Sequence, residues 1–494
     1  MLKGSNPHLP VPGAIGPDGT GREPIVRHSL EIHLRKEVLH MKQLKHLDKL
    51  ELAEAVKLAD LVFRDPGQRS MGESFPAIFD PALGLSLGVI EEGRVVSFIG
   101  FVPQQIAVGD AVLDACALGS VCTHPDYRGQ GHASVLLGEA FHQAEAIGAS
   151  LMLISGTRSL YRRNGCHAFG SMRRYRLEAG VQPQADPRAR PLRPSDWFRL
   201  HSLSNAKPAA YRRSVAELAG QLRSAAVASM YDFTHSSFVL EEDGELAAYA
   251  VIASGPIPAG SDMEPFVVEW GGDDFKALAA MRAAMQEMRL PSLLLFVGSH
   301  ETRMQLLLQG SLYSGSHNQG TVKIIDLPLL WRQLSPYLEG RRKNGLAAPS
   351  VMEPVRSPSG EFALRLGEDE IPLSMREWTA LLFDGPDAEL DDGPDAFVRQ
   401  GAAPEADAGS TRSASDSGAV AGSARSASRS GVDAGSTRST SRSGADASAE
   451  TAVAVQTPAE PASGPRLPFT QEQARMLRPY FPIPFPYTAG LSYI

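Results

Sequence analysis

Residues 118–133 read LGSVCTHPDYRGQGHA, and this stretch decides the fold of the region around it. The pattern predicts a strand that ends at Thr123, a turn at His124-Pro125, and a helix that begins within RGQGHA at 128–133. Small residues at 129, 131 and 133 let backbone N–H groups approach a ligand closely, and a helix N-terminus carries partial positive charge. With the guanidinium of Arg128, they predict a cradle suited to a pyrophosphate.

The spacing of this loop excludes two common nucleotide-binding motifs. A dinucleotide-binding loop needs three glycines spaced G-x-G-x-x-G, and a nucleotide P-loop needs Gly-Lys followed by Ser or Thr. Neither pattern is present in residues 118–133.

The elements on either side of the loop predict a mixed α/β sheet. Apolar spacings of three and four favour a helix from Gln43, and Glu92-Gly93 joins two apolar runs in a hairpin. The predicted strands are Gly84–Glu91, Val95–Pro103, Ile106–Leu113, Ala117–Thr123, Ser150–Ser155 and Phe169–Leu177, and the predicted helices after the loop are about Ala133–Ile147 and Ser159–Asn164.

Changes in composition divide the rest of the chain. A second section repeats the element order of the first, which indicates an internal duplication. Residues 385–466 are so poor in large apolar side chains that we expect a disordered insert, whereas the aromatic tail after it should dock onto the folded body. The predicted ranges are a disordered lead at 1–40, a first domain at 41–180, a linker at 181–190, a second domain at 191–326, a small α+β domain at 327–384 with 467–494, and the insert at 385–466.

Composition narrows the class of protein. The 494 residues suggest about three domains. The net charge of -8 disfavours a nucleic-acid partner. Three cysteines fit a reducing cytosol better than a disulfide scaffold, and we expect a cytoplasmic protein. The chain has neither a signal-peptide pattern nor an apolar run long enough for a membrane span, so no membrane partner is expected. No Cys/His cluster has zinc spacing, so no metal is expected.

Two motifs together resemble the GNAT superfamily of N-acetyltransferases. Arg128-x-x-Gly131-x-Ala133 is similar to the loop that holds the acyl-CoA pyrophosphate in that family. Leu160-Tyr161-x-x-x-Gly165-Cys166 is similar to its L-Y-x-x-x-G-F segment, with Cys166 where Phe is usual. The resemblance covers about residues 43–178 and implies the GNAT fold, here with two tandem GNAT-like domains.

The resemblance also implies a cofactor and a mechanism. The cofactor is acetyl-CoA as co-substrate, which an amine attacks directly, and Tyr161 is in the position of the general acid. The alternative for Tyr161 is a core aromatic residue on a short helix. In this family the pantetheine arm lies between two strands that splay apart. The residues implied in cofactor binding are Val121, Cys122, Thr123, Arg128, Gly129, Gln130, Gly131, His132 and Ala133.

The residues near the loop identify no general base, because His124 and Asp126 fit the turn and Glu139 fits a solvent-facing position. In the second section, Glu269–Asp274 (EWGGDD) is the counterpart of the loop. It has acids where a pyrophosphate would lie, so we expect that section to bind no CoA and instead to form a wall of the substrate groove.

The whole arrangement resembles the enhanced-intracellular-survival type of acetyltransferase. That type joins an active GNAT domain, a degenerate GNAT domain and a sterol-carrier-like C-terminal domain, and its C-terminal carboxylate reaches the active site. The resemblance implies that Ile494 is catalytic and that the acceptor is a primary amine of a small cationic molecule. The alternatives are a protein Lys or N-terminal acetyltransferase and a non-catalytic acyl-CoA sensor or scaffold. A homo-oligomer is compatible with all three.

Overall fold

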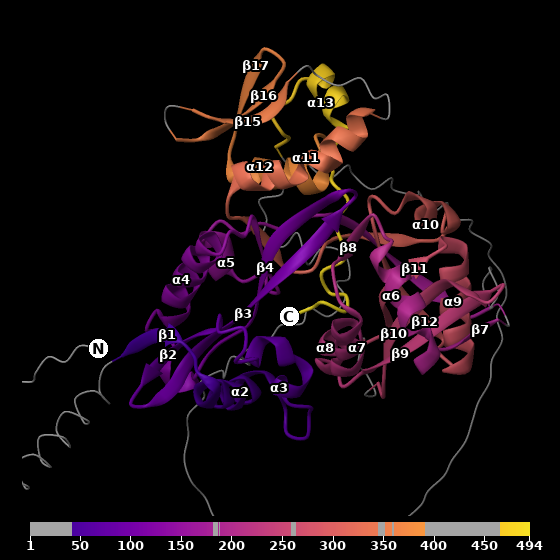
Figure 1. Cartoon of the computed structure of the whole chain (residues 1–494), viewed down its shortest axis with the longest axis horizontal. Helices are drawn as coiled ribbons and strands as arrows, with labels where there is room; N and C mark the ends of the chain where they lie inside the picture. The colour runs from indigo at the N-terminus through magenta and orange to yellow at the C-terminus, as the bar shows by residue number, and fades with distance from the viewer. Residues whose placement is uncertain are drawn as a thin grey trace, which may run out of the picture.

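A computed structural model of the chain describes residues 42–180, 186, 188–257, 263–343, 351–357, 360–390 and 465–494. The predicted lead at 1–40 lies outside these residues, as does most of the predicted linker and of the predicted insert. The described chain forms two seven-stranded mixed sheets and a three-stranded antiparallel sheet, with helices packed on them (Figure 1). The predicted mixed α/β fold is therefore confirmed.

The first sheet has the order β1-β2-β3-β4-β5-β14, with β8 paired to β3. Only β4 and β5 are parallel in it. Phe98 packs in the core that contains α2, and its neighbour Ile99 packs in the core that contains α4, so the two helices cover opposite faces. The elements up to the loop are β1 (Gln43–His46), α2 (Lys49–Phe63), α3 (Met71–Ser74), β2 (Leu87–Glu91), β3 (Arg94–Val108) and β4 (Ala111–Thr123), and those after it are α4 (His132–Ala146), β5 (Leu151–Ile154), α5 (Ser159–Arg163) and β6 (Ser171–Glu178).

Two sequence predictions in this sheet were wrong. Residues 43–46 are a strand paired with β2, and the helix begins only after Asp48, whose carboxylate caps it. Pro103 does not end its strand, because β3 and β4 each run on as one long strand. Pro103 is tolerated because β3 pairs only with β4 between Ile99 and Ile106, so its other edge needs no N–H donor there.

The second sheet has the order β13-β6-β12-β11-β10-β9-β7. Its strand–helix–strand–helix order repeats that of the first section as predicted, and Asp243-Gly244 joins β9 and β10 in a hairpin, whereas β13 was not foreseen. The elements are β7 (Ala189–Pro191), α6 (Trp197–Asn205), β8 (Ala209–Tyr211), α7 (Val215–Ser224), α8 (Ala226–Ser229), β9 (Thr234–Glu242), β10 (Glu245–Ser254), β11 (Phe266–Gly272), α9 (Asp274–Glu287), β12 (Ser292–Gly298), α10 (Thr302–Leu307), β13 (Tyr313–His317) and β14 (Thr321–Ile324).

The two large sheets exchange strands. The sequence places β6 at the end of the first sheet, but β6 lies between β12 and β13 of the second. In return β14, predicted in the second sheet, pairs with β5 of the first from Thr321↔Ile154 to Ile324↔Leu151. Local pattern cannot predict this exchange, because either sheet satisfies an apolar strand equally well. The sheets therefore do not follow the predicted ranges 41–180 and 191–326 one to one.

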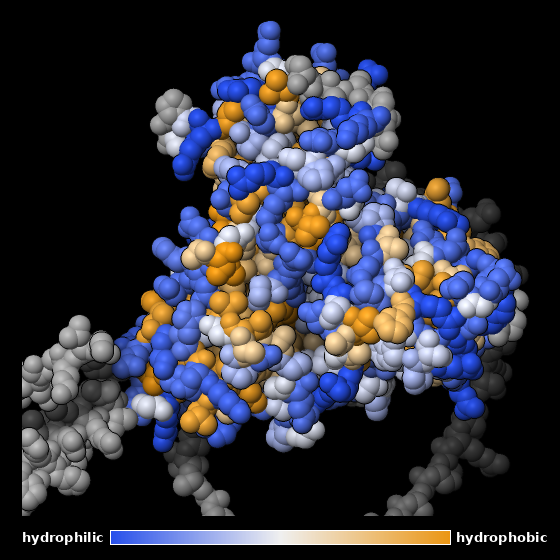
Figure 2. Space-filling view, in the orientation of Figure 1, coloured by the Kyte–Doolittle hydropathy of each residue, from blue (hydrophilic) through white to orange (hydrophobic). Residues whose placement is uncertain are grey.

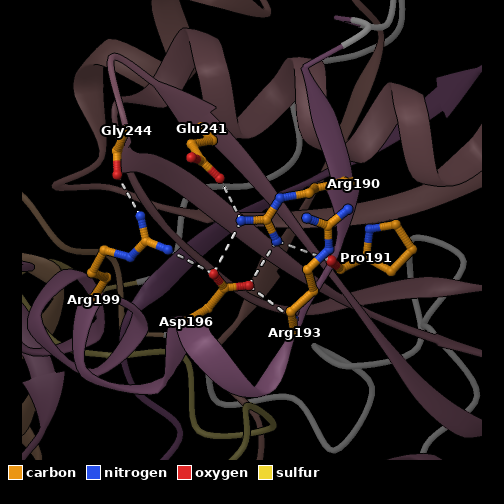
Figure 3. Close-up of polar contacts among 7 residues, drawn as sticks. All are labelled: Arg190, Pro191, Arg193, Asp196, Arg199, Glu241 and Gly244. Carbon is orange, nitrogen blue, oxygen red and sulfur yellow. Dashed lines mark hydrogen bonds and ion pairs between the residues drawn. The ribbon is translucent and has the colours of Figure 1, made fainter.

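A buried carboxylate fixes the chain where it enters the second sheet. Asp196 is fully buried and accepts hydrogen bonds from the Arg190 guanidinium at 2.7 and 3.0 Å and from Arg199 at 3.0 Å (Figure 3). It also accepts from the backbone N–H of Arg193 at 2.8 Å. Because Arg190, Arg193 and Arg199 all donate to this carboxylate, the last residues of the predicted linker are held against the sheet as β7.

The C-terminal unit stands on the first sheet (Figure 1). Trp331 and Trp378 share a core with Leu113 of β4 and Leu153 of β5. The ends of the predicted insert are ordered, because the N–H of Leu390 donates to the carbonyl of Pro465 at 2.7 Å. The elements are α11 (Leu327–Lys343), β15 (Met352–Arg356), β16 (Phe362–Leu366), β17 (Asp369–Leu373), α12 (Met375–Asp384) and α13 (Gln471–Leu477).

The tail, residues 481–494, leaves α13 and runs down between the two large sheets to the C-terminus (Figure 1). Phe481, Phe485 and Tyr493 are all buried. The prediction that the aromatic tail docks onto the folded body is confirmed. Apolar residues are visible over both the left and the right part of the molecule in this view (Figure 2).

Candidate active site

The site forms where β4 and β5 part. The two strands pair from Ala115↔Leu151 to Leu118↔Ile154. Beyond this point β4 continues to Thr123, paired with β3 but no longer with β5. A bulge marks the parting point, because Gly100 pairs with Gly119 but Phe98 pairs with Cys122. The extra residue bends β4 away from β5 and leaves backbone groups of β4 unpaired on that side.

The predicted loop crosses the end of this opening. Gly129 has a φ of 78° and Gly131 a φ of 80°, which is a left-handed conformation that favours glycine. Gly131 is also the N-cap of α4 and offers no side-chain acceptor to the first turn. The first N–H groups of α4 therefore remain available to an anion.

A cavity of about 630 Å³, here called the loop cavity, lies between the loop, β4 and α5. Every residue that the resemblance assigned to the cofactor lines it except Gln130. Tyr161 lines it too, so the structure brings both motifs into one cavity. Its other lining residues, which were not predicted, are Val62, Tyr127, Ser134, Arg158 and Leu160.

Arg158 is the missed residue with the clearest chemistry. It follows β5, precedes Tyr161 by three positions and is the N-cap residue of α5. The signal was present in the sequence, since a basic residue in a loop between a buried strand and the predicted acid is a candidate partner for charge.

His132 contributes to this site differently from the other loop residues. Its side chain is buried, and its Nε2 lies 3.4 Å from Oε1 of Glu91 at the end of β2. Burial, with help from Lys42, lowers the pKa of this imidazole. The buried ring is therefore neutral near pH 7, and the surface that His132 can offer an anion is its backbone N–H.

Tyr161 is buried at the inner end of the loop cavity. Removal from water raises the pKa of its phenol to about 12, and the nearby charge of Arg158 opposes part of that shift. The phenol therefore keeps its proton over the whole neutral range and can act as a donor. Burial also raises the pKa of Cys122 and Cys166, so both thiols stay protonated and pack in the core.

The C-terminus of the chain lies beside β4, the strand that ends at the loop. The main-chain carbon of Ile494 is so close to Gly119 that a Cβ on this glycine would lie 2.5 Å from it. The carbonyl of Ser492 accepts a hydrogen bond from Nε2 of Gln104 at 3.2 Å, and the hydroxyl of Tyr493 bonds Ser155 at the end of β5. The terminal carboxylate is thus held at the bulge of β4.

A larger cavity of about 950 Å³, here called the interdomain cavity, opens beside the terminal carboxylate. Residues of β3, β4 and β8 in the first sheet line it, together with residues of α7 and Leu491–Ile494 of the tail. Asp80, Asp114 and Glu217 give it negative charge. Of its two arginines, Arg213 is neutralised by Glu269 through hydrogen bonds of 2.7 and 3.0 Å. The balance of charge favours a cationic ligand.

At the corresponding place, the second sheet has neither a free helix N-terminus nor a tyrosine like those of the first. Its counterpart of α4 is α9, whose N-terminus is capped by the Asp273 carboxylate through the N–H of Lys276 at 3.1 Å. An internal carboxylate thus occupies the place that the first helix leaves to an anion. The third residue of α10 is Met304, whereas the third residue of α5 is Tyr161.

The described residues hold neither a metal site nor a membrane-spanning helix. Among the described residues, no group of three His, Cys, Asp or Glu side chains could hold a metal ion. Within the same part of the chain, no helix has both the length and the apolar character needed to cross a membrane.

Comparison with known proteins agrees with this geometry. Residues 43–169 match the family described as acetyltransferase (GNAT) domain. The match contains the loop, Tyr161 and the parting point of β4 and β5. A search of curated proteins found no match.

Solved structures share the fold at low identity. A GCN5-related N-acetyltransferase from Anabaena variabilis aligns with a TM-score of 0.51 and 13% identity, over 69% of this chain and 90% of that one. A probable N-acyltransferase from Enterococcus faecalis aligns with a TM-score of 0.50 and 16% identity, over the same shares, 69% and 90%. Eis1 from Mycobacterium abscessus aligns with a TM-score of 0.45 and 10% identity, over 67% of this chain and 85% of that one.

Proposed function

Because residues 43–169 are an acyltransferase domain of the GNAT type, we propose that the chain transfers an acetyl group from acetyl-CoA to a primary amine of a small cationic molecule. One observation carries the proposal. The loop cavity with Tyr161 reaches β4 at its bulge, and Ile494, which lines the interdomain cavity, lies against Gly119 at the same bulge. A proton donor and a carboxylate are thereby brought to one strand from two cavities.

The loop cavity fits the CoA half of this substrate. Bound acetyl-CoA supplies a thioester acetyl group that an amine can attack without an acyl-enzyme step. Arg128 and the first N–H groups of α4 bind the pyrophosphate, and the backbone of Val121–Thr123 pairs with the pantetheine amides. A volume of about 630 Å³ falls within the usual range of pockets that enclose a small-molecule ligand.

The acids of the interdomain cavity select the acceptor in this proposal. Asp80, Asp114 and Glu217 attract a molecule with several ammonium groups, and the Ile494 carboxylate holds the one that reacts. That carboxylate then takes up the ammonium proton, which frees the nitrogen lone pair. Polyamines and aminoglycosides are acceptors of this class.

Tyr161 gives its phenolic proton to the departing thiolate, and the phenol regains a proton from the attacking nitrogen, which loses its second proton as the amide forms. The raised pKa of the phenol keeps it protonated until that moment. The same dry surroundings raise the proton affinity of a thiolate beside it, so the transfer is less uphill than the two groups' values in water suggest.

We also propose the domain assignment that goes with this function. Residues 41–180 are the catalytic GNAT domain, 191–326 a GNAT-like domain without cofactor, and 327–384 with 467–494 a sterol-carrier-like domain. The order β11, α9, β12, α10 supports the second assignment, since it repeats β4, α4, β5, α5. The three-stranded sheet with α11, α12 and α13 supports the third only as an α+β unit.

The experiment is thiol release from acetyl-CoA against a panel of polyamines and aminoglycosides. Wild type, Tyr161→Phe and a chain lacking Leu491–Ile494 are measured together, with Tyr313→Phe on exposed β13 as the matched control. We expect kcat to fall about 100-fold in the first two and to stay unchanged in the control. If wild type binds acetyl-CoA but releases no thiol with any amine, the chain is a sensor or acts on protein, and the proposal is wrong.

A further inference from the structure

The second sheet has an opening of its own between parallel strands. β11 and β12 pair at a single position, Phe266↔Leu294, and separate beyond it. In the first sheet the corresponding opening, between β4 and β5, leads into the loop cavity. The capping by Asp273 closes the second opening to a phosphate, which leaves its use unexplained.

The tail of the chain fills this second opening. The Tyr487 ring stacks on Phe296 of β12, with ring centres 5.0 Å apart and planes 13° from parallel. Gly490 lies against β11, because a Cβ on it would be 3.4 Å from the carbonyl oxygen of Val268. Residues 487–490 therefore touch both strands at the point where they part.

One buried side chain makes three hydrogen bonds to the tail at the second opening. Asn318, only 1% exposed, lies between β13 of the second sheet and the exchanged strand β14. Its Nδ2 donates to the carbonyl of Pro486 at 2.8 Å, and its Oδ1 accepts from the N–H and the hydroxyl of Thr488, both at 2.8 Å. The Thr488 hydroxyl also contacts the carbonyl of Gln319 at 2.6 Å.

The tail runs directly from this clamp to the active site. Thr488 is six residues from Ile494, and Leu491, Ser492 and Tyr493 are all buried on the way. Gln221 links the end of the tail to Arg213, because its Oε1 accepts hydrogen bonds from both the Ser492 hydroxyl and the Arg213 guanidinium. Fixing the tail at residues 486–490 thus restricts where its terminal carboxylate can lie.

We propose that the opening between β11 and β12 is a peptide-binding site for the chain's own residues 486–490, and that Asn318 is the residue that positions the Ile494 carboxylate. The second sheet holds residues 486–490, which end in a turn, where the first sheet, under the proposed function on which the positioning role rests, holds the pantetheine arm. The second domain then serves catalysis by orienting a general base rather than by binding a cofactor.

The test compares Asn318→Ala with wild type by two readouts, with Asn205→Ala, an exposed amide on α6, as matched control. The first is release of Ile494 by a carboxypeptidase, which needs no catalytic activity. The second is kcat with acetyl-CoA and a reactive amine. We expect release to accelerate and kcat to fall about tenfold in Asn318→Ala, because two buried tail groups lose their partners. KM for acetyl-CoA should not change.

A double variant separates positioning from general damage to the fold. In a chain lacking Leu491–Ile494, the terminal carboxylate belongs to Gly490 and no longer reaches β4, so Asn318→Ala has no reacting group to misplace and should lower kcat no further. An equal loss in both backgrounds would overturn the positioning role. If Asn318→Ala leaves carboxypeptidase release and kcat at wild-type values while the truncation lowers kcat, the inference is wrong and the proposed function stands. If the truncation leaves kcat unchanged, the carboxylate mechanism fails, and release of Ile494 alone decides whether the peptide site exists.

Discussion

The substitution Gly119→Ala tests the position of the terminal carboxylate most directly. An added Cβ would lie 2.5 Å from the main-chain carbon and oxygen of Ile494, whereas ordinary contact begins at 3.4 Å. The chain end must therefore retreat by about 1 Å. A misplacement of that size in a reacting group costs about 100-fold in rate, or ~2.7 kcal/mol of activation free energy.

The assay is steady-state thiol release with Gly119→Ala, and the control is Gly138→Ala on α4, where no atom lies within 4 Å of the added Cβ. We expect kcat to fall in the first variant and to be unchanged in the second, with both melting temperatures near that of wild type. In a chain without Leu491–Ile494 the Gly119→Ala substitution should have no effect on kcat. A Gly119→Ala enzyme with wild-type kcat would refute the reasoning.

Four further predictions follow from the site and the fold. Because the pKa of Tyr161 is raised to about 12, its phenol stays protonated below that pH, and the ratio of wild-type to Tyr161→Phe kcat should be constant from pH 7 to pH 10; a ratio that collapses above pH 9 would contradict this. Arg128→Ala should raise KM for acetyl-CoA about tenfold with little change in kcat, measured by initial rates at two salt concentrations. Arg213→Met leaves the Glu269 carboxylate buried without its cation, so thermal melting should show a loss of ~3 kcal/mol, and adding Glu269→Gln should recover part of it. Since Leu390 and Pro465 are hydrogen-bonded, replacing residues 391–464 with a short Gly-Ser linker should leave melting temperature and kcat unchanged, and a drop in either would show that the segment contributes to the fold or to the site.

The local parts of the site could be predicted from sequence. The loop at 128–133 and Tyr161 each depend on a strand, a turn and a helix that are contiguous in the chain, so their pattern is complete within a few residues. The same holds for the hairpin at Asp243-Gly244 and for the helix that begins after Ser374. Ile494 was expected at the site only through a family resemblance, since nothing in its own residue type indicates chemistry.

The non-local parts could not be predicted. Asn318 meets Thr488 across 170 positions, and neither residue belongs to a recognisable motif. The strands β1, β13 and β15 are four or five residues long and are largely polar or only half-buried, so apolar periodicity is too weak to reveal them. The pairing of β6 with β12 depends on a contact between sheets that local alternation of apolar residues does not encode.

The exchange of β6 and β14 has a consequence for how the protein is made. During synthesis β5 has no outer neighbour until β14 leaves the ribosome, some 170 residues later, which is a wait of roughly 10–30 s at usual translation rates. Within that interval β6 waits some 120 residues for β12. Each large sheet is complete only when strands from both parts of the chain have been translated. Until then the nascent chain carries exposed strand edges that invite aggregation. The two lobes are in this sense one folding unit, and neither half of the chain can mature alone.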